Sequence, residues 1–172
     1  MHILPLFVAI PLGGAFFISL VSRKLKWLPD ILSNAITFTL LISAFLMLGR
    51  GPFIYKMGGW PPPVGINLVL DGLSILMLVI ICTMSFVATL FSVRYMERYT
   101  SKSRYYTLFL LMVAGMNAVV LSGDMFNLYV FTEVAAVASY ALVAFGTEHE
   151  ELEAAFKYMI LGSVASAFIL LG

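Results

Sequence analysis

The sequence has few residues that carry charge, bind metals or form disulfides. Only 11% of its 172 residues are Asp, Glu, Lys or Arg, against about 25% in soluble domains. It holds one cysteine, Cys82, and two histidines, His2 and His149. An internal disulfide is therefore excluded, and no metal-ligating cluster is indicated. The net charge of +1 lacks the basic excess that is typical of nucleic-acid-binding proteins. We expect no cofactor, no metal site and no nucleic-acid partner.

Apolar residues are what the sequence has in abundance. They make up 62% of the chain, too many for a globule coated by water, so the solvent must be the lipid bilayer. A spanning helix needs about 20 mainly apolar residues. We predict an all-α membrane protein, a single transmembrane domain over residues 1–172 with about six helices. The expected spans are 3–22, 31–49, 72–93, 105–122, 125–146 and 152–171.

The long connection 50–71 does not fit a helix. Gly51-Pro52, Gly58-Gly59 and Pro61-Pro62-Pro63 are breakers, and the flanks are rich in residues that favour strands. This pattern predicts a short external β-hairpin that turns at 58–63. Asp71, where the next helix begins, is expected to be its N-cap.

The positions of the basic residues predict the orientation. Arg23, Lys24 and Lys26 follow the first apolar run, and Arg94, Arg98, Lys102 and Arg104 follow the third. The opposite side has only Arg50 and Lys56. Because cytoplasmic loops carry the excess of Lys and Arg, we expect a multi-pass protein of the cell membrane, with its N-terminus outside and loops 23–30 and 94–104 in the cytoplasm.

Glu133 is the one charged residue expected deep in the membrane. It lies nine residues after Asp124, which places it roughly 13 Å along a helix. Desolvation favours the neutral form of such an acid unless a cation pairs with it, and intramembrane acids usually face a bundle interior or a hydrated path. Glu133 is therefore a candidate proton relay. The alternative is a protonated carboxyl that serves packing alone.

Lys157 is a second candidate for the proton relay, and Tyr129, Tyr140 and His149 are secondary candidates. Lys157 is the only basic residue expected inside a helix near Glu133, but it is offset by roughly 10 Å in depth. An ion pair with Glu153, four residues earlier, explains it equally well. Tyr129 and Tyr140 fall on nearly the same helix face as Glu133, where ordinary packing is an equal alternative. His149, expected in an acidic cytoplasmic loop, suits a solvated residue better than a proton entrance.

Three stretches resemble one known family. They read GGWxPPxGI followed by LDGLS at 58–74, GDxFNLYVxxEV ending in SYxLV at 123–143, and AAxKY with GS at 154–163. They are similar to the hairpin and the third, fifth and sixth helices of the proton-pumping antiporter-like family. That family includes the large membrane subunits of complex I, Mrp-type sodium/proton antiporters and membrane-bound hydrogenases. The likeness to the Mrp D-type subunit is greatest.

The resemblance implies a role for Glu133 as the family's essential glutamate. In the family this acid pairs with a lysine on a seventh helix, and further lysines or histidines carry protons onward. The sequence ends at Gly172, after the sixth expected helix, so the resemblance implies a truncated N-terminal part. We expect a short antiporter-like subunit beside other membrane subunits, including a full-length homologue, in a complex that moves protons or sodium ions. No catalytic site is expected in this chain.

Two other functions stay open at the level of sequence. The first is a structural spacer or assembly subunit of the same kind of complex, in which the acid is retained but idle. The second is a small self-assembling carrier, which would move ions on its own.

Overall fold

The computed structural model describes residues 3–21, 27–60, 65–98 and 101–172. Arg23, Lys24 and Lys26, on which the predicted orientation partly rests, lie outside these ranges, as does part of the predicted turn at 58–63. The described helices are α1 (Leu6–Val21), α2 (Leu28–Met47), α3 (Gly72–Tyr95), α4 (Lys102–Leu121), α5 (Met125–Val143) and α6 (His149–Leu171). Two short 3-10 helices lie in the connections, at Met57–Gly59 and Met96–Arg98.

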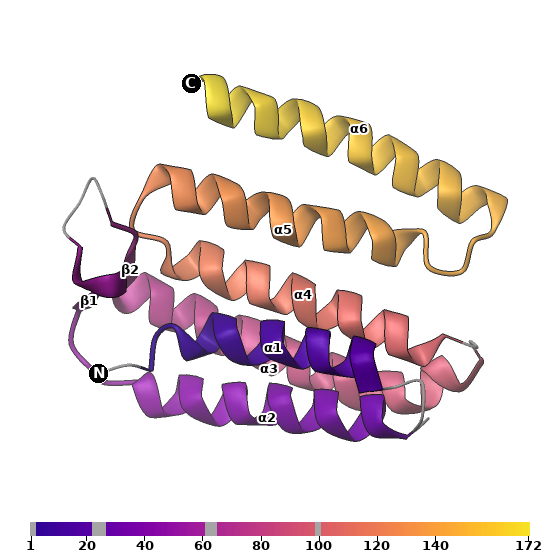
Figure 1. Cartoon of the computed structure of the whole chain (residues 1–172), viewed down its shortest axis with the longest axis horizontal. Helices are drawn as coiled ribbons and strands as arrows, with labels where there is room; N and C mark the ends of the chain where they lie inside the picture. The colour runs from indigo at the N-terminus through magenta and orange to yellow at the C-terminus, as the bar shows by residue number, and fades with distance from the viewer. Residues whose placement is uncertain (1–2, 22–26, 61–64, 99–100) are drawn as a thin grey trace.

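The predicted all-α membrane fold with a β-hairpin between the second and third helices is confirmed. Five of the described helices, α2 to α6, are long and apolar enough to cross a membrane, and α1 is a shorter apolar helix of 16 residues. Strands β1 (Phe53–Lys56) and β2 (Asn67–Leu70) pair antiparallel, with Phe53 opposite Leu70. The hairpin lies at one end of the helices, beyond the end of α2 (Figure 1).

Several helix ends differ from the predicted ones, each for a local reason. Helix α2 begins at Leu28 rather than 31, with Pro29 in its first turn, where a missing N–H costs nothing. Helix α4 begins at Lys102 rather than 105, and α5 ends at Val143 rather than 146. Loops 23–30 and 94–104 are correspondingly shorter than predicted, since helices α2, α3 and α4 extend into them.

The start of α6 corrects the prediction for His149. This residue is the first of α6, not part of a loop. The backbone N–H of Glu148 donates to the side chain of Glu151 at 3.3 Å, so an acidic side chain satisfies a free donor at the helix start. The acidic stretch that resembled a solvated loop is therefore the first turn of a helix, where negative charge is favourable.

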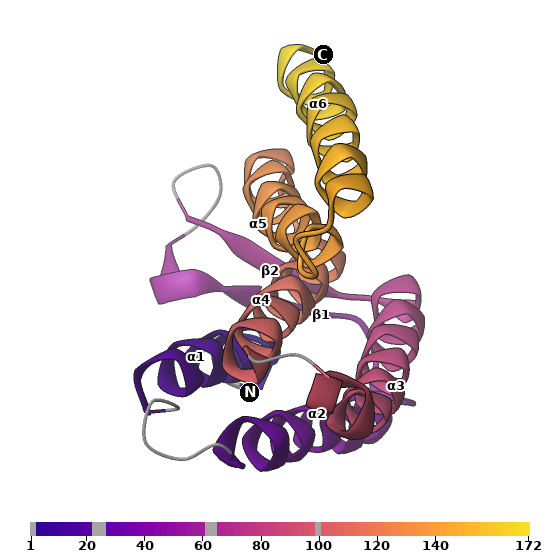
Figure 2. The ribbon, with the colours of Figure 1, turned by 90° about the vertical axis from the view of Figure 1, so that its right-hand side faces the viewer.

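The helices form a compact group with an extension. Viewed along the helices, α1 to α4 are grouped together, while α5 and α6 extend from α4 in a row (Figure 2). Helix α4 packs on α1 and α5, and α6 packs chiefly on α5. The hydrophobic core lies among α1 to α4 and the hairpin. Large parts of α5 and α6 therefore face outward.

Polar contacts hold the core helices together. The buried hydroxyls of Thr37 and Thr89 are 2.9 Å apart and link α2 to α3. At the end opposite the hairpin, Lys102 pairs with Asp30 at 3.2 Å and donates to the Val93 carbonyl at 3.3 Å. The ion pair joins the starts of α2 and α4, and the bond to Val93 adds the end of α3. These three helix ends therefore lie together, which supports placing them on one side of the membrane.

Candidate functional site

The position of Glu133 follows from how α5 begins. Asp124 is the N-cap of α5, and its carboxylate accepts a hydrogen bond from the backbone N–H of Asn127 at 2.7 Å. The side chain of Asn127 in turn donates to the Ser122 hydroxyl at 3.0 Å. With the helix start fixed, Glu133 lies two and a half turns inside α5, near the middle of the helix.

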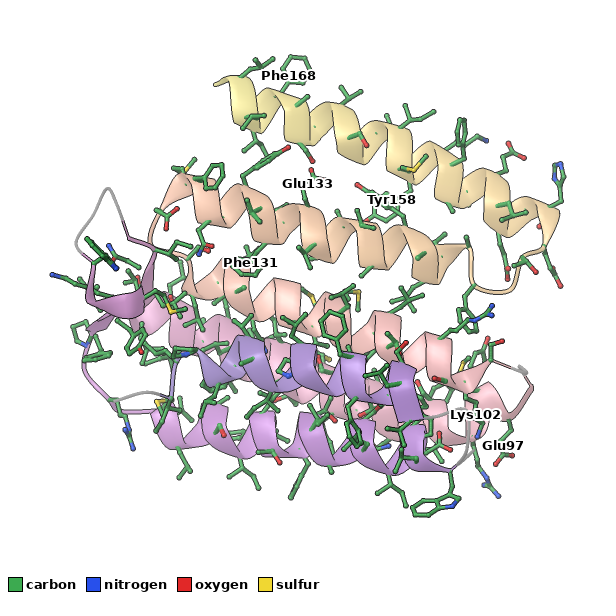
Figure 3. All side chains as sticks on the ribbon, viewed as in Figure 1. Glu97, Lys102, Phe131, Glu133, Tyr158 and Phe168 are labelled. Carbon is green, nitrogen blue, oxygen red and sulfur yellow. The ribbon has the colours of Figure 1, made fainter. Side chains whose placement is uncertain are left out.

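Glu133 lines a cavity between α5 and α6, which we call the α5–α6 groove. The cavity has a volume of about 480 Å³. Its lining residues are Glu133, Val137, Tyr140, Ala141, Ala144, Leu152, Ala155, Phe156, Met159 and Ser163. Glu133 lies on the side of α5 that faces α6 (Figure 3). The carboxyl is thus directed into a largely apolar space between two helices.

One oxygen of Glu133 lacks a partner in this space. Its Oε1 is buried, and no described residue forms a hydrogen bond with it. A buried polar atom without a partner is costly, and native proteins normally satisfy it with protein or ordered water. A bound water would relieve that cost, and the groove has space for one.

Tyr140 is the predicted candidate that the structure brings to Glu133. It lines the same groove as Glu133. The rings of Tyr140 and Tyr158 meet edge to face, with centroids 4.8 Å apart, so α6 contributes a phenol as well (Figure 3). Gly162 makes room for Tyr140, because a Cβ at Gly162 would overlap the Tyr140 hydroxyl.

The structure does not bring the other three candidates into the groove. Lys157 donates to Glu153 at 2.5 Å, and both side chains are more than half exposed, so the predicted ion pair is confirmed. Tyr129 is half-buried on α5 but does not line the groove. His149 is exposed at the start of α6.

Two residues of α6, Ser163 in the groove and Tyr158 beside it, were missed from the sequence. Tyr158 and Ser163 belong to α6 and meet the α5 side through the tyrosine pair and the groove lining. Their spacing of five residues matches no simple face of a helix. Tyr158 follows directly after Lys157, whose charge is the stronger signal in that stretch of the sequence. A search for hydroxyls on both predicted neighbouring helices would have found them.

Comparisons with known proteins agree on one group of membrane subunits. Residues 62–106 match the family model "NADH-Ubiquinone oxidoreductase (complex I), chain 5 N-terminus", and residues 122–172 match "NADH:quinone oxidoreductase/Mrp antiporter, TM". NADH-quinone oxidoreductase subunit N of Desulforudis audaxviator is 36% identical over 99% of this chain and 34% of its own length.

Solved structures give the same picture. A chain of the membrane-bound sulfane sulfur reductase, an archaeal respiratory membrane complex, has a TM-score of 0.92 and 33% identity over 99% of this chain and 36% of that one. A chain of the Mrp complex from Dietzia sp. has a TM-score of 0.89 and 30% identity over 99% of this chain and 34% of that one. The chain thus spans about a third of the length of the relatives it matches.

Proposed function

Because the chain belongs to the antiporter-like membrane subunits of Mrp and complex I-like complexes, we propose that it contributes to moving protons or sodium ions, with Glu133 as the protonatable relay. The chain is a multi-pass membrane protein, and the proteins that resemble it belong to multi-subunit membrane complexes. We propose that its partners are other membrane subunits, a full-length antiporter-like homologue among them.

The observation that carries this proposal is the unpartnered Oε1 of Glu133 in the α5–α6 groove. An acid that served packing alone would be expected to have a fixed partner, since leaving a buried polar atom unpaired costs about 1–3 kcal/mol. An acid that takes up and releases a proton needs space for water and a neighbouring hydroxyl. The groove supplies the space, and Tyr140 supplies the hydroxyl.

We further propose that the hairpin end of the molecule faces outward. The exposed Trp60 lies at that end, as suits the boundary between lipid and water. The described basic residues Arg94, Lys102 and Arg104 lie at or near the opposite end, where α3 ends and α4 begins. This arrangement would place the opening of the groove near Ala144 and Leu152 toward the cytoplasm.

The test is Glu133→Gln in the intact complex, with Glu150→Gln as the control. Both substitutions remove one carboxylate, but Glu150 is exposed in the first turn of α6. Ion transport is measured in membrane vesicles with a pH-sensitive dye, and assembly by co-purification of the neighbouring subunits. We expect Glu133→Gln to slow transport by roughly a hundredfold without loss of assembly, and Glu150→Gln to leave both unchanged.

A spacer function is the alternative, and one observation favours it. Lys157 is held by Glu153, so among the described residues no basic side chain lines the groove with Glu133. If Glu133→Gln left transport unchanged while deletion of the chain loosened assembly, the spacer function would replace the relay.

A further inference from the structure

A second cavity lies at the hairpin end of the molecule, away from the α5–α6 groove. We call it the hairpin pocket. It has a volume of about 420 Å³, within the range of roughly 300–1,000 Å³ that is typical of sites for small ligands. Its floor is formed by the buried side chains of Leu4, Met47 and Leu70, and its rim includes Arg50, Gly51 and Pro52.

The backbone places a single cation at the rim of this apolar pocket. Gly49 has a positive φ of 82°, which turns the chain just after α2. The N–H of Arg50 then donates to the Met47 carbonyl at 3.1 Å. The floor is fixed as well, since Leu70 belongs to a strand and pairs with Phe53, which also lines the pocket.

Arg50 has no acidic partner in the described part of the chain. The ion pairs there involve Lys102 and Lys157, and the residues outside the described ranges include no Asp or Glu. The planar guanidinium suits oxyanions such as carboxylate and phosphate, which it binds through two parallel hydrogen bonds. An anion at the rim would therefore find a charge that no protein group neutralises.

We propose that the hairpin pocket binds one anionic phospholipid, with an acyl chain over the apolar floor and the headgroup phosphate on Arg50. The occupant is a membrane lipid because the pocket opens where a spanning helix ends and a hairpin with the exposed Trp60 begins. Lipid tails are as apolar as the floor, so tail burial gives little selectivity within a bilayer. The charge of Arg50 provides the selectivity for an anionic headgroup.

Three substitutions in the full chain test this proposal separately. Arg50→Gln removes the cation at the rim. Lys56→Gln removes an exposed cation at the same end, on β1, that does not line the pocket. Gly51→Phe adds a bulky ring at a position that lines the pocket, and the backbone there has room for a side chain because a Cβ at Gly51 meets no atom within 4 Å.

Native mass spectrometry of the purified full chain would measure binding of phosphatidylglycerol and of phosphatidylcholine. We expect the unaltered chain to prefer phosphatidylglycerol about fivefold, the effect of one basic residue near an anionic surface. Arg50→Gln should abolish that preference, Lys56→Gln should keep it, and Gly51→Phe should weaken binding of both lipids.

Three results would overturn the proposal. One is equal binding of the two lipids by the unaltered chain, and another is the same loss of preference in Arg50→Gln and Lys56→Gln. The third is unchanged lipid binding by Gly51→Phe, with its folding checked by circular dichroism. If Gly51→Phe does not fold, the comparison of Arg50→Gln with Lys56→Gln still decides the matter, because both alter exposed side chains.

Discussion

A close approach of the α4 and α5 backbones gives a sharp test of the packing. Gly115 on α4 is buried against Ala135 on α5. A Cβ placed on Gly115 would lie 2.8 Å from the Ala135 backbone nitrogen, 2.9 Å from its Cβ and 3.0 Å from its Cα. Ordinary contacts begin at about 3.4 Å, so Gly115→Ala must push the two helices apart by several tenths of an ångström.

The expected cost follows from two opposing effects. Overpacking of a close contact typically costs about 1–3 kcal/mol, whereas alanine is preferred over glycine inside a helix by about 0.5–1 kcal/mol. Gly13 on α1 is the matched control, because a Cβ there meets nothing within 4 Å. Gly13→Ala thus reports helix preference alone, and the difference between the two variants isolates the steric cost.

Unfolding in detergent micelles by added dodecyl sulfate, followed by circular dichroism, measures both variants. We expect Gly13→Ala to raise or maintain the free energy of unfolding, and Gly115→Ala to lie about 1–3 kcal/mol below it. Because Ala135 is two residues from Glu133, the displacement of α5 should also slow ion transport in the intact complex. Equal stability of the two alanine variants would refute the close contact of α4 and α5.

Two further predictions concern single hydrogen bonds. Thr37→Val removes the bond to Thr89 and should cost about 0.6 kcal/mol in the same micelle titration; a loss above about 2 kcal/mol would contradict this, since Thr89 keeps its bond to the Phe86 carbonyl. At Asp71, the hydrogen bond from the Ser74 backbone N–H lowers the carboxyl pKa below its usual 3.8. The cap is therefore fully effective above pH 3.8 and is lost as the pH falls through the lowered pKa. The protection of the Ser74 amide from hydrogen exchange, taken relative to the intrinsic exchange rate at each pH, should fall on that acidification, and Asp71→Asn should remove this fall; an identical profile of protection against pH in both chains would count against the cap.

Much of the fold is predictable because the bilayer restricts what a chain can do. Long apolar runs must become helices there, and the breakers around Gly58 leave a hairpin as the simplest connection. The cap at Asp71 was predicted and is confirmed, since Ser74 donates to it at 2.7 Å. The start of α6 was harder, because Glu148 lacks the usual side chain of an N-cap and a run of acidic residues equally resembles a solvated loop.

The site was only partly predictable, for a geometrical reason. The depth of Glu133 follows from counting residues along one helix. Which face of α6 meets α5 does not, because the surface of α6 is apolar nearly all round and has no polar side to exclude. The contact of Tyr140 with Tyr158 and the space that Gly162 leaves for the Tyr140 hydroxyl depend on how the two helices are rotated against each other. Those contacts require the structure.

The contact between Gly162 and the Tyr140 hydroxyl couples the position of α6 to that of a side chain on α5. The hydroxyl of Tyr140 occupies the space where a Cβ of residue 162 would lie, so it cannot move closer to α6. A sliding or tilting motion of α6 must carry the phenol along or eject it, and either outcome changes the distance between the hydroxyl and Glu133. The position of the Tyr140 hydroxyl is thereby tied to how α6 packs on α5.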